Sequence, residues 1–311
     1  MPARLLLASL LLLSMAPAAL ADPAAAELKF VPANAGGVAF MDHARLVEHS
    51  QYGAMQEFAR AQGRGEGIRL AEAAGLAPGK GFQRTWTFEM GRGQEVTILA
   101  GGVDGDRLRD FAKRSMAAGY AEGEHAGIGW FRIAPAQRAA VLAPGVAVIA
   151  PAAKLDAVLE VAAGDKPALP GRKAFRALLA AAQKGSPAMW ALAWVPKRVR
   201  DDMALGAAPE LAKVERAVLR AEGKDAITFR VIGFATDAGS AKAAAKALQR
   251  EIEAFAGSSP ILTALGISAL VRRVDVKSKG SQVLASIALE AAQLGLLART
   301  GGRVIGLIQA R

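Results

Sequence analysis

The sequence predicts an α+β protein of two related domains, each a mainly antiparallel sheet covered by helices on one side. Three features of the 311 residues point to this class: alternating strand patterns joined by short turns, helices that begin at N-cap residues, and a second occurrence of the same order of elements. Short returns between strands favour antiparallel pairing, and an amphipathic helix buries its apolar stripe against a sheet.

The first half opens with a strand predicted over 38–41 and continues with a hairpin. Residues 85–90 alternate between apolar and polar side chains, which is typical of a half-buried strand. A turn at 91–93 leads to a returning strand over 96–100. Asp104 then predicts a helix start, because its carboxylate can accept hydrogen bonds from the free backbone N–H groups there. The half ends with strands over 128–134, 139–143 and 146–150 and a helix marked by Leu155, Val158, Leu159 and Ala162.

The second half shows the same order of elements. They are strands over 190–195, 218–222 and 227–234, a helix capped by Asp237, strands over 268–276 and 282–289, and a closing helix. The turn glycines Gly91 and Gly223 are 223 − 91 = 132 residues apart, and the cap residues Asp104 and Asp237 are 237 − 104 = 133 residues apart. This near-constant offset predicts an internal repeat.

Residues 164–171 contain two Pro and two Gly and form the linker between the halves. The predicted organisation is a signal peptide over 1–21, a first domain over 22–165, a second domain over 166–300 and a tail over 301–311. The tail is apolar and flanked by Arg. It is expected either to pack on the second domain or to dock on a membrane surface or a partner.

The N-terminus has the three regions of a secretory signal peptide. Arg4 precedes an apolar run over 5–13, and Ala19-Leu20-Ala21 supplies the small-x-small end. Cleavage between Ala21 and Asp22 would leave a soluble protein in the periplasm or outside the cell. The alternative is an uncleaved N-terminal anchor.

Three runs of the sequence carry a resemblance to a known class of proteins. They are "VAFMDHARL", "GLAPGKGFQRTWTFEMGRGQEVTILAGGVDGDRLRDF" and "AVLAPGVAVIAPAAKLDAVL". Together with the order of elements, they resemble exported bacterial proteins of unknown function in which a duplicated α+β domain follows a signal peptide. The resemblance covers nearly all of the chain after residue 21 and implies the architecture, with no catalytic motif to transfer.

Composition excludes several classes of protein. The apolar content of 52% excludes an intrinsically disordered chain, and the absence of Cys excludes disulfide scaffolds, thiol nucleophiles and Cys-based zinc sites. Net charge is 39 − 28 = +11, and +10 once Arg4 is removed with the signal peptide. Such a charge attracts anionic surfaces, although scattered solvated Arg side chains are the ordinary explanation.

No catalytic or cofactor motif is complete. The Gly-rich runs 63–67 and 75–81 lack the strand, spacing and Ser/Thr of nucleotide loops, and no Gly-x-Ser-x-Gly elbow occurs. The densest set of metal-ligand side chains is Asp42, His43, Glu48 and His49. Its two His are six residues apart, which puts them on different sides of a helix. We expect no enzymatic activity, no cofactor and no metal.

Two tryptophans mark the strand predicted over 190–195. Trp190 and Trp194 share one face of this strand, and the opposite face is apolar as well. Such a strand is typical of the centre of a sheet beneath helices, where both side chains would pack in the core. The functional alternative is that Trp190 and Trp194 line an apolar ligand cavity.

Basic residues cluster at Lys197, Arg198 and Arg200 and again at Arg272 and Arg273. No aromatic side chains that could stack on bases are interleaved with them, so nucleic acid is not an expected partner. These five cations are the predicted contacts with an anionic surface. The alternative is charged turns and strand edges that protect against aggregation.

These observations favour an exported, non-enzymatic binding or structural module of the bacterial cell envelope. Its expected partner is an unidentified protein or an anionic envelope component, including peripheral contact with a membrane. The alternative hypothesis is a carrier that holds an apolar ligand between sheet and helices. The third is a hydrolase assembled from dispersed carboxylates that leave no local motif.

Overall fold

The computed structural model describes residues 25–49, 52–53, 56, 65–91, 94–223, 226–258, 263–264 and 266–297. Their contacts divide them into two compact units. The N-unit comprises 25–49 and 65–190, and the C-unit comprises 52–53, 56 and the described residues from 191 onward. Both units contain helices and antiparallel sheet, which confirms the α+β class. The predicted signal peptide and the tail 301–311 lie outside the described residues.

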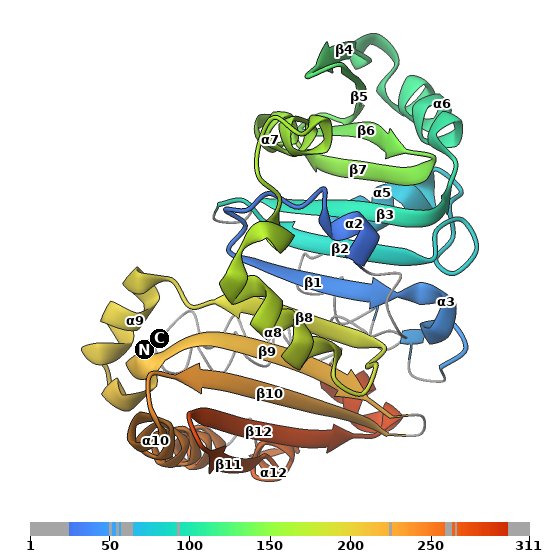
Figure 1. Ribbon diagram of the computed structural model, residues 1–311. Coiled ribbons are helices and arrows are strands. Elements are labelled where there is room, and N and C mark those ends of the chain that lie inside the picture. Colours follow the sequence, from blue (N-terminus) through green and yellow to red (C-terminus); the bar gives the residue numbers. More distant parts are fainter. Residues whose placement is uncertain are drawn as a thin grey trace. The chain divides into compact units, whose positions relative to one another are not determined.

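The N-unit sheet is antiparallel throughout and has the strand order β1-β2-β3-β7-β6-β5-β4 (Figure 1). Its strands are β1 (Gly37–Asp42), β2 (Arg84–Glu89), β3 (Glu95–Val103), β4 (Glu122–His125), β5 (Ile128–Ala134), β6 (Gln137–Ala143) and β7 (Gly145–Pro151). The predicted hairpin at 85–100 is therefore confirmed as β2 and β3. Gly91, in the turn between them, has a φ of 120°, a conformation that glycine adopts without strain.

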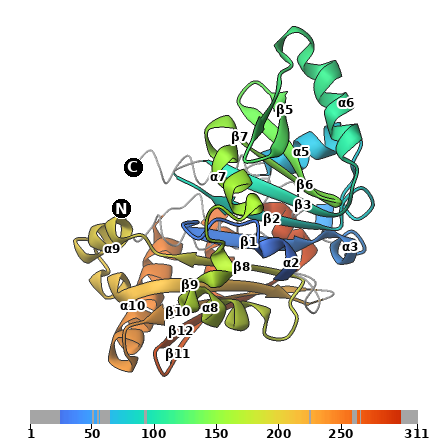
Figure 2. The same cartoon turned by 45° about the horizontal axis from the view of Figure 1, so that its top comes forward.

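The helices of the N-unit connect and cover these strands. They are α2 (Ala25–Leu28), α3 (His43–Leu46), α5 (Glu66–Ala73), α6 (Gly105–Met116), α7 (Ala152–Ala163) and α8 (Lys173–Gln183), with short 3-10 turns η1 (Ala117–Gly119) and η2 (Leu169–Gly171). Asp104 caps α6 as predicted, because its carboxylate accepts from the backbone N–H groups of Asp106 and Arg107 at 3.1 Å. From this start α6 packs along β5 (Figure 2).

Helices cover both faces of the N-unit sheet, which corrects the expectation of a single helical layer. Leu99 pairs in register with Ala147, and both belong to the buried cluster that contains Leu108 of α6. Ile98 and Val148 also pair and point to the opposite face, yet they too are buried. The helix α7 packs on β6 and β7 and buries its apolar stripe outside that cluster. Five consecutive buried residues in β3, at 96–100, reflect this double cover.

The C-unit has the strand order β8-β9-β10-β12-β11. Its elements are β8 (Met189–Trp194), in which the change of unit falls, α9 (Lys197–Ala204), the 3-10 helix η3 (Pro209–Lys213), β9 (Val214–Glu222), β10 (Ile227–Ala235), α10 (Ala238–Gly257), α12 (Ile267–Val271), β11 (Asp275–Lys279) and β12 (Gln282–Leu289). Residues 291–297 are helical. No helix of the described residues combines the length and the apolar composition that crossing a bilayer requires.

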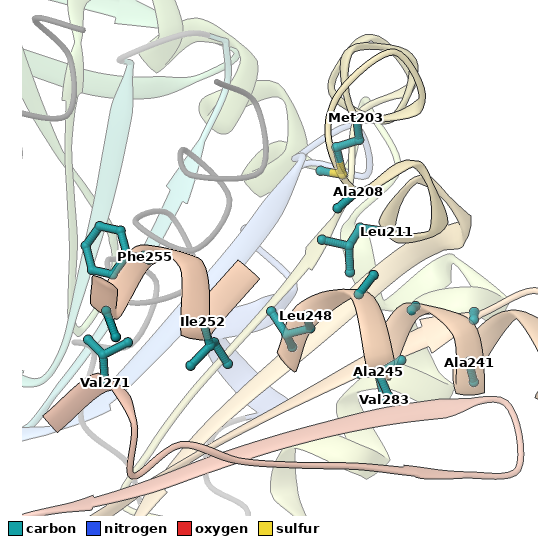
Figure 3. Close-up of a cluster of buried hydrophobic side chains, with 14 of the residues drawn as sticks. Met203, Ala208, Leu211, Ala241, Ala245, Leu248, Ile252, Phe255, Val271 and Val283 are labelled. Carbon is teal, nitrogen blue, oxygen red and sulfur yellow. The ribbon is translucent and has the colours of Figure 1, made fainter. Parts of the chain in front are cut away.

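The core of the C-unit lies along α10 (Figure 3). Small buried residues such as Ala241 and Ala244 let this helix approach the strands closely, and Leu248, Ile252 and Phe255 fill the rest of its apolar stripe. Asp237 caps the helix as predicted, accepting from the backbone N–H of Ser240 at 2.8 Å. Hydrogen bonds from the Ser240 side chain and backbone lower the pKa of Asp237 to about 2.

The strand predicted over 268–276 is wrong in its first half. Residues 267–271 form α12, and the strand β11 begins only at Asp275. Ile267, Leu270 and Val271 are buried at helical spacing, and α12 packs against α10. In a helix all three side chains share one face, whereas in a strand Leu270 would face away from Ile267 and Val271. Because the segment is a nearly continuous apolar run, its sequence did not distinguish a helix from a strand.

Candidate anion-binding surface

The helix α8 of the N-unit has one apolar side and one exposed side, and all of its charged residues are basic. Its apolar stripe consists of Phe175, Leu178 and Ala182, which are all buried at helical spacing. The opposite side is exposed and consists of Lys173, Ala174, Arg176, Ala177 and Ala180. Because the apolar stripe packs against the protein, the opposite side of α8 faces solvent.

Main-chain contacts position the start of α8. Leu169 in η2 donates its backbone N–H to the carbonyl of Val31 at 2.7 Å, and the Arg172 side chain donates to the carbonyl of Ala33 at 2.9 Å. The backbone N–H of Ala33 in turn donates to the carbonyl of Pro167 at 3.0 Å. These bonds tie α8 to the N-terminal segment of the same unit.

The segment from Arg172 to Lys184 contains four basic residues and no acidic residue. In the described chain, no carboxylate is paired with Lys173 or Arg176, and both side chains belong to exposed residues. Arg172 and Lys184 flank them at the two ends of the helix. We call the exposed side made of Lys173, Arg176, Ala177, Ala180 and Lys184 the α8 strip.

The strip runs along one side of α8. Lys173 and Arg176 are three residues apart, and Ala177, Ala180 and Lys184 continue at three- and four-residue spacing, so these residues share one side of the helix. From Lys173 to Gln183 the helix rises about 15 Å at 1.5 Å per residue, and Lys184 follows its last residue. Ala177 and Ala180 separate the cations with methyl groups alone, so a partner can approach the helix closely between them.

The predicted basic cluster of Lys197, Arg198 and Arg200 lies on α9, where acidic residues offset it. Lys197 pairs with Asp201 at 2.8 Å, and Arg200 pairs with Glu215 of β9 at 3.3 Å. Three cations and the acids Asp201 and Asp202 leave a net charge of 3 − 2 = +1 on the helix. Of the three predicted cations, only Arg198 has no ion-pair partner among the described residues.

The other predicted pair, Arg272 and Arg273, lies far from this cluster within the C-unit. Both follow α12, and Arg273 donates to the backbone carbonyl of Ala288 at 3.1 Å. Figure 3 shows Val271 of α12 near Phe255 at one end of α10, whereas Met203 of α9 lies over the stretch of α10 that contains Leu248 and Ala245. That helix has 20 residues and is about 30 Å long. The five predicted cations therefore do not form one surface.

Trp190 lies in an aromatic cluster of the N-unit core. Its ring centroid is 5.6 Å from that of Phe40 and 5.4 Å from that of Trp86, and its exposed fraction is 1%. A ligand that reached the Trp190 ring would have to displace these neighbours. Trp194, at the other end of β8, is only partly buried. Core packing, the ordinary role considered for Trp190, is therefore what the structure shows.

The histidines of the predicted metal-ligand cluster are not placed as ligands. His43 is fully buried at the start of α3, and its Nε2 lies 3.1 Å from the hydroxyl of Thr85. Burial lowers the pKa of His43 to about 3, so the ring is neutral in the folded protein. Within the described residues, no group of three or more His, Asp or Glu side chains is placed to hold a metal ion.

A shallow depression lies at the start of α10, lined by Pro209, Glu210, Lys213, Gly239, Ser240 and Ala243. Its groups are already engaged, because Glu210 pairs with Arg250 at 2.8 Å and the Ser240 hydroxyl donates to Asp237 at 2.6 Å. The ionised Asp237 repels an anion at this helix start. This depression is therefore not the candidate site.

Comparison with known proteins does not assign the chain to a family or a function. No protein-family model matches the sequence, and no curated protein matches it. Crystal forms I, III and IV of TP0453 align over 88% of this chain and 96–97% of their own chains, at 11–12% identity and TM-scores of 0.48–0.49. A similarity of this size supports no argument about function.

Proposed function

We propose that the protein is an exported, non-enzymatic binding module of the cell envelope that associates electrostatically with an anionic component. The observation that carries the proposal is the α8 strip, where Lys173 and Arg176 face solvent with no acidic residue between Arg172 and Lys184. Unpaired cations on a rigid, well-packed element attract an anionic partner without first breaking internal ion pairs. In this proposal the α8 strip, and not the five cations predicted from the sequence, contacts the anionic component.

The pattern of the first 21 residues supports export, which gives the strip an envelope component as its partner. Positive surfaces inside a cell meet nucleic acid, whereas those outside the cytoplasm meet lipid headgroups and acidic polymers. The non-enzymatic part of the proposal is supported by the incomplete catalytic motifs of the sequence and by the full burial of His43, one of its three histidines.

We further propose that the two units are copies of one α+β unit. Strand order β1-β2-β3-β7-β6 in the N-unit corresponds to β8-β9-β10-β12-β11 in the C-unit, and an Asp-capped helix follows the third strand in each. The N-unit has β4 and β5 in addition. Superposition of the five strands in an experimental structure tests this; strands that fail to superpose would argue against a common origin.

The electrostatic proposal is tested with the protein purified from its own host, mixed with isolated envelope fractions. We expect co-sedimentation that declines steadily as the salt concentration rises from about 0.05 to 0.5 M, because the Debye length shortens over this range. Charge reversal of the strip by Lys173→Glu and Arg176→Glu should abolish the association. Association that is indifferent to salt and to this double variant would overturn the proposal.

A further inference from the structure

We infer that the α8 strip contacts the phosphate headgroups of a lipid bilayer, lying on the surface without entering the hydrocarbon core. This inference rests on the proposed function and names the anionic partner. It follows from two properties of the strip: its cations, and the kinds of side chain that are missing from it.

The cations suit phosphate. The guanidinium of Arg176 can form two parallel hydrogen bonds to one phosphate group, and the ammonium of Lys173 adds a compact charge one turn away. Each basic side chain near an anionic leaflet contributes a similar increment to binding. Two such side chains, Lys173 and Arg176, are exposed one turn apart and have no carboxylate partner in the described chain.

The exposed side of α8 carries no aromatic side chain. Nucleic acids are held by stacking their flat bases on aromatic rings, in addition to charge. A strip with Ala177 and Ala180 between its cations offers no ring for stacking. Small side chains and positive charge are enough for contact with a layer of headgroups.

Large apolar side chains are also missing from the strip. The exposed large apolar residues of the described chain are Val47, Val141, Val199 and Leu205, and none of them lies on α8. A helix enters the acyl layer by burying such residues. The contact is therefore peripheral, and salt reverses it.

The helix α9 is the competing candidate for a membrane contact. Leu205 at its end is 90% exposed, and Arg198 lies two turns before it on the same side. Asp202 lies between them on that side and is exposed. Its carboxylate repels an anionic leaflet at the point where the helix would touch, so α8 is the better fit.

The test measures binding of the full chain to vesicles of phosphatidylcholine alone and to vesicles with about one third phosphatidylglycerol. We expect binding only to the second kind, complete release by about 0.5 M salt, and no leakage of trapped dye. Lys173→Gln with Arg176→Gln should weaken binding about 30-fold. Lys242→Gln with Lys246→Gln removes the same charge from the exposed side of α10 and should change binding less than about threefold.

Soluble probes separate the sources of negative charge. Inorganic phosphate and the carboxylate polymer alginate are added as competitors at matched ionic strength. Capture by alginate without any binding to vesicles would overturn the lipid assignment while leaving the proposed function intact. Salt-resistant binding or dye leakage would contradict a peripheral contact. Failure to bind any anionic probe would refute the proposed function itself.

Discussion

The helices α8 and α9 carry similar numbers of cations but present different surfaces. On α8, Lys173 and Arg176 stand apart at helical spacing and have no carboxylate partner in the described chain. On α9, Lys197 pairs with Asp201 one turn along the helix, and Arg200 pairs with Glu215 of β9. The difference shows that free positive charge depends on where the acids lie, and the density of Lys and Arg along the sequence does not reveal it.

The two helices also differ in how firmly they are held. The helix α8 has 11 residues and buries Phe175, Leu178 and Ala182, whereas α9 has eight residues and buries only Met203. Long, well-anchored helices hold their surface side chains in a fixed relation to one another. A rigid strip loses less conformational entropy when it binds than a loosely held one.

The largest expected effect comes from removing the anchor of α8. Phe175→Ala should lower the free energy of unfolding by about 3–5 kcal/mol, because a fully buried ring leaves a cavity. A control on the exposed side of α9, Val199→Ala, should cost less than about 0.5 kcal/mol, since this side chain is 38% exposed. Urea unfolding measures both. Equal costs would mean that Phe175 does not anchor α8.

The dependence of stability on pH tests the burial of His43. Burial lowers the pKa of His43 from 6.5 to about 3, so between these values the unfolded chain binds a proton that the folded chain does not. Stability should therefore fall as pH drops from about 6.5 toward 3, by about 1.4 kcal/mol per pH unit at most. His43→Gln removes the titrating group. A pH dependence that is as steep in this variant as in the natural chain would refute the role of His43.

A smaller effect is expected from freeing the cations of α9. Asp201→Asn with Asp202→Asn removes the partner of Lys197 and the exposed carboxylate between Arg198 and Leu205. Binding to anionic vesicles should strengthen a fewfold, because surface ion pairs of this kind contribute up to about 1 kcal/mol. Unchanged vesicle binding would show that Asp201 and Asp202 do not prevent α9 from binding anionic vesicles.

Much of the fold could be predicted because its signals are local. Alternation over 85–90 marked β2, and Asp104 and Asp237 marked two helix starts that the structure confirms. The helix at 267–271 was missed because its apolar run fits a buried strand as well as a buried helix. Tertiary packing against α10 decides between these alternatives, and a single sequence does not show it.

The candidate site was harder to predict than the fold. Lys197, Arg198 and Arg200 attract notice because they are close in sequence, whereas Lys173 and Arg176 are separated by Ala174 and Phe175. A helical projection of 172–184 with a count of its acids would have identified the strip. The pairing of Arg200 with Glu215 joins a helix to a strand and could be found only from the structure.

The most direct test compares two double variants with the same change in net charge on the same anionic vesicles. Lys173→Gln with Arg176→Gln acts on α8, and Lys197→Gln with Arg200→Gln acts on α9. We expect about a 30-fold loss of affinity for the first and less than a threefold loss for the second, since only the first removes unpaired cations. Equal losses, or a larger loss for α9, would contradict the assignment of the anionic contact to α8.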